Sequence, residues 1–276
     1  MLELSSPAEG WRSQVVGWFG RLSARVGQRT FDALNYVGEI CILLVHTLAS
    51  VLTPPLRVRQ ILDQLVRIGW QSVPIAFLIS IFTGMVLAFQ SAYQMQKFAA
   101  TMFIPGLVAL SLVREIGPVL TALIVAGRSG SAIAAELGTM QVTEQIDALE
   151  TLATDPVRYL VVPRFVALVV ALPMLTLYAD AFGIFGGWLI GVFKLNMGAD
   201  RYWELTRSIL TLKDVFSGLI KSVIFAGIIA IVSSFEGFRT QGGAEGVGRS
   251  TTMAVVLSFI LIIASDCLFT VIFYFS

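Results

Sequence analysis

Five apolar stretches, each close to the length needed to cross a bilayer, constrain the fold of this chain more than any other feature. They are Ser72–Tyr93, Phe103–Gly127, Leu160–Phe193, Val215–Phe238 and Thr251–Phe275. A helical span needs about 20 apolar residues, and helices satisfy all their backbone hydrogen bonds internally. The composition agrees, since 13% of the residues are charged against about 25% in soluble domains. The sequence therefore predicts an all-α polytopic membrane protein with five main transmembrane helices.

The N-terminal region differs in character from the rest of the chain. Between Arg12 and Thr30, apolar residues recur at helical spacing with arginines between them, which is typical of an amphipathic helix in the membrane interface. Phe31–Leu52 is apolar but carries polar residues and stops at two prolines, so we expect a shallow or re-entrant element. Met1–Gly10 has no basic segment followed by an apolar core, so no cleaved signal peptide is predicted. We expect an interfacial region at residues 1–55 and a membrane domain at residues 56–276.

Basic residues are unevenly distributed between the two sides of this topology. With the N-terminus inside, the outer loops hold Lys97, Lys194, Arg201, Arg207 and Lys213. The inner segments hold Arg12, Arg21, Arg25, Arg29, Arg57, Arg59, Arg67, Arg128, Arg158, Arg164, Arg239 and Arg249. Cytoplasmic loops carry the excess of basic residues in membrane proteins. The sequence therefore predicts an N-terminus in the cytoplasm and a C-terminus on the opposite side.

Several ionisable residues lie deep within the predicted spans. Arg114 is about 17 Å into its span at 1.5 Å per residue, hence near the bilayer midplane. Glu115 follows it, and Asp180, Lys221 and Asp266 lie in other spans. Such residues are expensive in a bilayer and are usually functional. They could form ion pairs that hold helices together. Alternatively, Arg114 and Lys221 could line a polar cavity that receives an anionic group such as a lipid phosphate, which the planar arginine fork binds bidentately.

Two segments are rich in small residues. The run AGRSGSAIAA extends from Ala126 to Ala135, and Gly183, Gly187 and Gly191 recur at four-residue spacing. Small residues let helix backbones approach closely, so we interpret both segments as packing faces. A phosphate-binding nest is the alternative for the first segment, and packing between subunits is an option for the second.

The segment between the second and third spans, Gly138–Asp155, is too polar to cross the bilayer. Glu144, Asp147 and Glu150 recur three apart, which predicts one acidic face on a helix that Pro156 ends. Apolar contacts would come from Met140, Ile146, Leu149 and Leu152. Such a helix could be a solvated connector, but its mixed acidic and apolar surface favours docking into a groove on a soluble partner.

The glycine-rich run Gly243–Ser250 nearly matches the phosphate-binding P-loop. A P-loop needs a preceding strand, a lysine and a soluble α/β core, whereas here a membrane span precedes the run and Arg249 replaces the lysine. We therefore predict a tight cytoplasmic turn, with Ser250 or Thr251 capping the last helix. No nucleotide site is expected, so active transport would require an ATPase on a separate chain.

Composition excludes several other classes of function. The net charge of +1 gives no basic field for nucleic acid. His46 is the only histidine, and the two cysteines are isolated. We therefore predict no metal site, no cofactor and no catalytic residues.

The motif region resembles the MlaE/YrbE permeases of bacterial lipid-transport ABC systems. The resemblance rests mainly on Ser111–Arg164, which reads SLVREIGPVLTALIVAGRSGSAIAAELGTMQVTEQIDALETLATDPVRYLVVPR. Supporting matches are GMVLAFQ at Gly84–Gln90, GIFGGWLIG at Gly183–Gly191, LIKSVIFA at Leu219–Ala226 and GAEGVGRSTTMAVV at Gly243–Val256. The resemblance covers roughly residues 60 to 276 and is highly specific, whereas the first fifty residues match only as an interfacial elbow.

This resemblance implies a function and partners. Such permeases are inner-membrane homodimers that bind a cytoplasmic ABC ATPase dimer through a coupling helix and carry a periplasmic MCE-domain hexamer. Many also have a small STAS-domain subunit. The substrate is a glycerophospholipid, and transport helps maintain outer-membrane lipid asymmetry. By position, the lipid-cavity residues would be Arg114, Glu115, Lys221 and Asp266, and the ATPase-coupling residues Met140, Glu144, Asp147, Leu149 and Glu150.

Three other functions stay open at the level of sequence. An ion-coupled transporter or channel could use Arg114, Glu115, Asp180 and Asp266 as a relay. A membrane anchor for cytoplasmic proteins would use Gly138–Asp155 only as a scaffold. Within the family, an MCE-type importer could carry a sterol or another lipid.

Overall fold

The computed structural model describes residues 28, 30–32, 34–53 and 57–275. Met1–Gly10 and nearly all of the predicted interfacial helix Arg12–Thr30 lie outside these residues. The chain divides into two compact units, Met1–Val45 and His46–Ser276. The described residues contain helices and turns but no strand, which confirms the all-α fold class.

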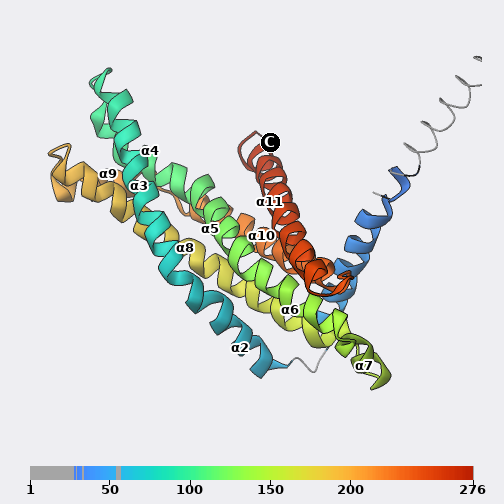
Figure 1. Cartoon of the computed structure of the whole chain (residues 1–276). Helices are drawn as coiled ribbons and strands as arrows, with labels where there is room; N and C mark the ends of the chain where they lie inside the picture. The colour runs from blue at the N-terminus through green and yellow to red at the C-terminus, as the bar shows by residue number, and fades with distance from the viewer. Residues whose placement is uncertain (1–27, 29, 33, 54–56, 276) are drawn as a thin grey trace, which may run out of the picture. The chain divides into compact units, whose positions relative to one another are not determined.

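The described helices follow one another with short connections (Figure 1). Thr30–Val51 comes first. The α-helices that follow are α2 (Val58–Gly69), α3 (Val73–Gln96), α4 (Ile104–Ser111), α5 (Gly117–Val125), α6 (Ser131–Val142), α7 (Gln145–Thr151), α8 (Val162–Phe193), α9 (Ala199–Ile209), α10 (Leu212–Phe238) and α11 (Gly243–Phe275). Two 3₁₀ turns, η1 (Trp70–Ser72) and η2 (Thr101–Phe103), and three π-helical segments, η3 (Leu112–Ile116), η4 (Ala126–Gly130) and η5 (Val157–Val161), join neighbouring α-helices.

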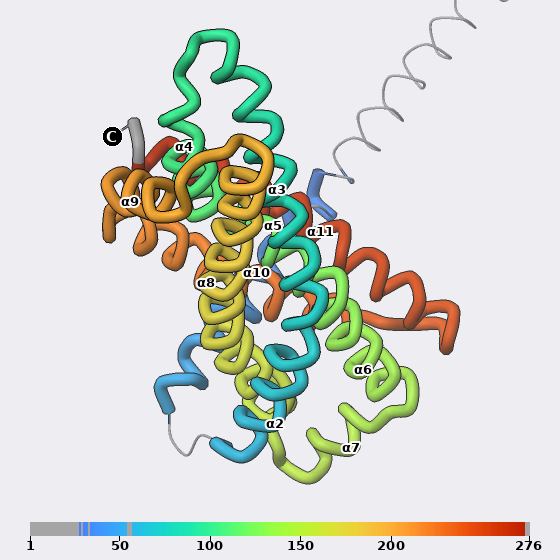
Figure 2. Tube along the Cα trace, turned by 90° about the vertical axis from the view of Figure 1, so that its left-hand side faces the viewer, coloured from blue at the N-terminus to red at the C-terminus, as the bar shows by residue number. Residues whose placement is uncertain are grey.

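Each of the five predicted spans is a helical run that extends beyond the predicted bounds. The runs are Val58–Gln96, Thr101–Val142, Val157–Phe193, Leu212–Phe238 and Gly243–Phe273. The first three contain 39, 42 and 37 residues, more than the roughly 20 that a bilayer requires. α7 lies at one end of α8, and α4 and α9 lie at the other (Figures 1 and 2). The long runs therefore continue outside the hydrocarbon layer and build the two polar ends.

The element at Phe31–Leu52 differs from its sequence prediction. Instead of a shallow or re-entrant element, the structure has a continuous helix, Thr30–Val51, which is long and apolar enough to cross a membrane. Asp32 and Glu39 lie inside this helix without ending it, because acidic side chains leave the helical backbone bonds intact. The described helices therefore include six candidate spans.

Glycines set the contact between α3 and α8, which run side by side in both views (Figures 1 and 2). A Cβ added to Gly84 would lie 1.8 Å from the carbonyl oxygen of Gly183, and one added to Gly186 would lie 2.2 Å from that of Ile81. At Gly191 the Cβ would meet the Tyr202 ring at 2.5 Å. The predicted packing role of the glycine stripe is therefore confirmed for contacts inside one chain. Burial of Tyr202 in this contact raises the pKa of its phenol.

The second small-residue segment packs against α10. A Cβ on Gly130 would lie 2.9 Å from the Ser233 hydroxyl, and one on Gly237 would lie 2.6 Å from Leu137 Cβ. Neither Gly127 nor Gly130 has a positive φ, and a backbone nest needs a left-handed residue. The packing interpretation therefore holds, and the nest alternative is wrong.

The glycine-rich run before the last span is helical rather than a turn. Among the described glycines, only Gly242 and Gly243 have positive φ, +89° and +71°, and α11 begins at Gly243. Thr251 Oγ1 donates to the Gly248 carbonyl at 2.7 Å inside the helix. The predicted capping role of Ser250 or Thr251 is therefore wrong, because the turn ends about two helical turns earlier.

Gly84→Ala is expected to destabilise the protein, because the new methyl group would displace the α8 backbone at Gly183. Overpacking of this kind costs about 1–3 kcal/mol. That loss lowers the unfolding temperature by about 2–4 °C per kcal/mol in a chain of this size. Gly127→Ala is the matched control, since nothing lies within 4 Å of its Cβ position. Thermal unfolding in detergent measures both, and equal unfolding temperatures would contradict the packing assignment.

Candidate functional site

A buried lysine joins three membrane helices. The Lys221 ammonium lies 2.6 Å from Glu115 Oε2 and 2.8 Å from both Asp266 Oδ1 and Thr270 Oγ1. It also donates to the Arg114 carbonyl at 3.2 Å. The side chain is 0% exposed. We call Glu115, Lys221, Asp266 and Thr270 the lysine cluster; it links η3, α10 and α11.

The lysine cluster uses all the donors of its cation. An ammonium has three N–H groups, and four oxygens surround Lys221 Nζ within 3.2 Å. Thr270 Oγ1 accepts from Lys221 and lies 3.0 Å from Glu115 Oε1 and 2.9 Å from the Asp266 carbonyl, to either of which it can donate its one proton. Lys221 therefore has no donor left for a ligand unless the cluster opens.

Arg114 points away from the lysine cluster, to Asp214. Its Nε and Nη2 both lie 2.6 Å from Asp214 Oδ1. The other oxygen, Asp214 Oδ2, accepts from the Thr211 backbone N–H at 2.9 Å and from its hydroxyl at 2.7 Å, completing a capping box at the start of α10. A side chain that caps a helix is held in one rotamer, so Asp214 gives Arg114 a fixed partner.

Arg114 and Glu115, whose side chains point to different partners, both lie in the π-helical segment η3. A π-helical turn accommodates an extra residue without ending the helix and is frequent at functional sites. The carboxylate of Glu115 thus meets Lys221 on α10 while the neighbouring guanidinium reaches Asp214 at the start of α10. Arg128 and Arg158 lie in the other two π-helical segments, η4 and η5.

These contacts favour the first of the two hypotheses on the buried charges. Of the sequence-predicted residues, Lys221 forms ion pairs with both Glu115 and Asp266, and Arg114 pairs outside that set, with Asp214. Adding Asp214 to these four residues gives two positive and three negative charges. The group as a whole therefore carries one excess negative charge when ionised, which does not by itself attract an anion.

Asp180 does not join the lysine cluster. Its side chain is buried, and Oδ1 has no hydrogen-bond partner among the described residues. A Cβ on Gly117 would lie 1.8 Å from this oxygen, so the carboxyl group packs directly on the helix backbone just after η3. A relay through Asp180 would need water or a helix movement.

Sequence reasoning missed Asp214 and Thr270. The first follows Thr211 by three residues, as in a capping box, and the second follows Asp266 by four, on the same helix face. Both signals are local and common. They indicate a site only when the helices are brought together.

The acidic segment is shorter and more broken than predicted. α6 ends at Val142, Glu144 has a φ of +58°, and α7 covers only Gln145–Thr151. Pro156 does not end this helix but precedes η5. The left-handed residue at Glu144 makes the chain turn between α6 and α7.

The five predicted coupling residues divide into two groups. Glu144, Asp147 and Glu150 are exposed, as predicted. Met140 and Leu149 are partly buried and pack against the main hydrophobic core, so their place in a docking surface stays a prediction. Leu152, which follows α7, is 75% exposed and is an apolar side chain available to a partner.

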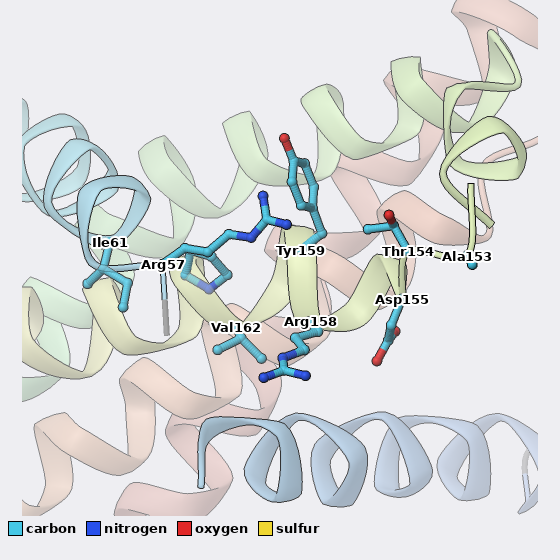
Figure 3. Close-up of a pocket in the computed structure, with 9 residues that line it drawn as sticks. Arg57, Ile61, Ala153, Thr154, Asp155, Arg158, Tyr159 and Val162 are labelled. Atoms are coloured by element: carbon cyan, nitrogen blue, oxygen red, sulfur yellow. The ribbon is translucent and has the colours of Figure 1, made fainter. Parts of the chain in front are cut away.

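A pocket of about 360 Å³ adjoins this segment. Arg57 and Tyr159 point to one side of η5, and Asp155 and Arg158 point to the other (Figure 3). The Arg57 guanidinium lies 4.2 Å from the centre of the Tyr159 ring. The Asp155 carboxylate lies 3.2 Å from His46 Nε2 and accepts a hydrogen bond from the Val157 N–H at 2.9 Å. These contacts fix the connection between α7 and α8.

Comparison with known proteins assigns the family. The family described as Permease MlaE matches residues 61–272. The chain belongs to the MlaE permease family. A probable ABC transporter permease protein of Rickettsia typhi is 46% identical over 89% of this chain and 95% of its own length. The intermembrane phospholipid transport system permease protein MlaE of Haemophilus influenzae is 35% identical over 90% and 96%.

The family also includes a plant relative. The chloroplast protein TRIGALACTOSYLDIACYLGLYCEROL 1 of Arabidopsis thaliana is 38% identical over 83% of this chain and 65% of its own length. The family and the six candidate spans establish this MlaE permease as a multi-pass membrane protein of the ABC permease type.

Lys221→Met is expected to destabilise the MlaE permease strongly, because it leaves Glu115 and Asp266 facing each other without their cation. Breaking a buried pair costs about 3–5 kcal/mol. The triple variant Lys221→Met, Glu115→Gln, Asp266→Asn removes all three charges and is expected to recover most of this loss. Lys213→Met, at an exposed lysine near the start of the same helix, is the control. Unfolding temperatures in detergent report the result, and a single variant as stable as the parent would refute the buried pairing.

Proposed function

We propose that this chain is the transmembrane permease subunit of an ABC transporter that moves glycerophospholipids between the bacterial inner membrane and a periplasmic MCE-domain protein. In this role it helps maintain outer-membrane lipid asymmetry. The observation that carries the proposal is the match to MlaE over 90% of the chain, with a relative named as an intermembrane phospholipid permease. The long apolar helices and the polar cluster between them suit a lipid substrate, which has both an apolar and a charged part.

The proposed assembly is a homodimer with a cytoplasmic ABC ATPase dimer, a periplasmic MCE-domain hexamer and, where present, a STAS-domain subunit. Support for the homodimer comes from α11, whose apolar window is only 11% buried within one chain. Support for the ATPase contact comes from the exposed acidic side chains of Glu144, Asp147 and Glu150 together with Leu152.

The proposed orientation places the N-terminus in the cytoplasm and the C-terminus in the periplasm. In the predicted topology the segments on the same side as α7 hold Arg57, Arg59, Arg67, Arg128, Arg158, Arg164, Arg239 and Arg249. Such an excess of arginine is typical of the cytoplasmic side. α4 and α9, at the opposite end, would then face the periplasmic protein.

Arg114 is the proposed contact for the lipid phosphate. Lys221 is fully enclosed, whereas the Arg114 side chain is 36% exposed. A phosphate could replace Asp214 as its partner, since both present oxygens to the guanidinium fork. Glu115 and Asp266 would keep Lys221 neutralised, and the apolar helix walls would hold the acyl chains.

Arg114→Ala is expected to lower lipid transport at least about tenfold, the scale of one lost charge-assisted hydrogen bond. The measurement uses the permease reconstituted in vesicles with its ATPase and MCE partners and follows transfer of a labelled phospholipid on addition of ATP. Arg59→Ala, at an exposed arginine on α2, is the control.

Transport by a folded Arg114→Ala complex at the parental rate would refute the headgroup role. Transport that follows an ion gradient and needs no ATPase would refute the ABC proposal in favour of an ion-coupled carrier. A co-purified sterol in place of phospholipid would identify the importer variant of the family.

Neutralising the acidic residues of the coupling segment is expected to weaken ATPase binding. The variant Glu144→Gln, Asp147→Asn, Glu150→Gln removes exposed charge without touching the core. Complementary charges chiefly raise association rates and are screened by salt, so the loss should be greatest at low ionic strength. Co-purification of the ATPase at low and high salt measures it. Asp200→Asn with Glu204→Gln on α9 is the control, and equal recovery for both variants at low salt would contradict the docking role.

A further inference from the structure

A small polar cleft lies between α2, η4 and α6, away from the lysine cluster. Its lining includes Gln64, Arg67, Gln71, Arg128, Ser129 and Glu136. The cleft has a volume of about 40 Å³, which is room for a few water molecules or for the oxygens of one tetrahedral anion. Because two arginines from different helical segments face so small a space, their guanidinium groups lie close to one shared ligand position.

The cleft and its immediate surroundings carry more positive than negative charge. Glu136 pairs with Arg67 through Oε2 at 3.1 Å and with Arg164 through Oε1 at 2.9 Å. Arg128 pairs with no carboxylate among the described residues. Three guanidinium groups thus share one carboxylate, which leaves an excess of two positive charges. Asp63, one turn before Arg67, makes no ion pair in the described part of the chain and does not line the cleft.

Arg128 is held in place by neutral groups. Its Nη1 donates to Ser72 Oγ at 2.9 Å, and its Nη2 donates to Gln71 Oε1. Ser72 in turn donates to the Ile68 carbonyl at 2.7 Å. A guanidinium has five N–H donors, so these contacts orient the fork without neutralising it. Glu136, which also lines the cleft, has one oxygen paired with Arg67 and the other with Arg164, so it does not neutralise Arg128.

We propose that this cleft binds a phosphate group through Arg67 and Arg128, with Gln71 and Ser129 completing the set of polar contacts. Arginine is the residue best suited to bidentate phosphate recognition. The phosphate could belong to a membrane lipid or be free in solution. A lipid source agrees with α2 and η1, where Val58, Leu62, Val66 and Trp70 form an exposed apolar row one helical turn apart. Such a helix face lies at headgroup depth in membrane proteins.

This site is distinct from the proposed transport site at Arg114. It lies on α2, η4 and α6, the helix that leads to α7, whereas Arg114 and Lys221 lie on η3 and α10. Binding of an anion would offset the excess positive charge and join α2 to η4 more tightly. The assignment needs neither the direction of transport nor the identity of the ATPase.

Native mass spectrometry of the purified full-length protein tests the site, in an uncharged maltoside detergent free of phosphate. The probes are inorganic phosphate, dioctanoyl phosphatidic acid and, as a phosphate-free lipid, dioctanoylglycerol. The parent protein is expected to bind one equivalent of a phosphate-bearing probe that Arg67→Gln with Arg128→Gln weakens at least about tenfold. Arg207→Gln, at an exposed arginine on α9, should bind like the parent.

The probes distinguish the two sources of phosphate. Saturation by inorganic phosphate would assign a free-phosphate site, and saturation by phosphatidic acid alone would assign a lipid headgroup. Arg114→Ala should retain this equivalent, which separates the result from that for the transport site. Arg128→Lys, which keeps the charge but loses the fork, should bind with intermediate affinity and serves if the double variant does not fold. The proposal would be overturned if the parent and the double variant bound equally, or if the parent and Arg128→Lys bound equally where the double variant does not fold. Binding of dioctanoylglycerol as tight as that of phosphatidic acid, or no binding at all, would also overturn it.

Discussion

The membrane domain depends on a single buried ammonium. Lys221 has lost all contact with solvent, and its charge is tolerable only because oxygens from η3 and α11 surround it. In a bilayer the association of helices gains little from apolar burial, so packing and polar contacts decide which helices meet. Close contacts at glycines set how near α3 and α8 come, whereas the lysine cluster determines which faces of η3, α10 and α11 meet. A neutral side chain at position 221 would remove the contacts that determine which faces of η3, α10 and α11 meet.

Interruptions of the α-helix influence the directions in which three arginine side chains of this protein point. Each of the three π-helical segments contains one, Arg114, Arg128 or Arg158. A π-helical turn shifts the phase of the side chains that follow while every backbone group stays within a helix. In the long run Thr101–Val142 this happens twice, so one continuous helix directs Arg114 towards Asp214 and Arg128 towards Ser72. A regular helix would distribute the same residues by a fixed period of 3.6 and could not meet both partners with the same neighbours.

The sequence predicted the spans because hydrophobic length is a local property, and it predicted the family because the run from Ser111 to Arg164 is specific. It could not predict that Lys221 chooses Glu115 and Asp266, since these residues are separated by 106 and 45 positions and only the packing of helices brings them together. The positive φ of Glu144 escaped prediction for another reason: acidic residues usually continue a helix, and the turn at this position comes from the surrounding fold. The coupling role of Met140 and Leu149 stays a prediction, because an amphipathic pattern shows that a face is apolar but not whether the core or a partner covers it.

The charges around Lys221 and Arg114 and those between α2, η4 and α6 differ in the sign of their net charge. This difference decides how each group can bind an anion. Around Lys221 and Arg114 the carboxylates exceed the cations by one, so an anion can enter only by displacing Asp214 or by changing the protonation of an acid. Between α2, η4 and α6 the guanidinium groups exceed the carboxylates by two, and no carboxylate competes with an anion for Arg128. A ligand that must be released is suited to the first arrangement, because the protein carries its own competitor for the arginine. A ligand that stays bound while the helices around it move is suited to the second.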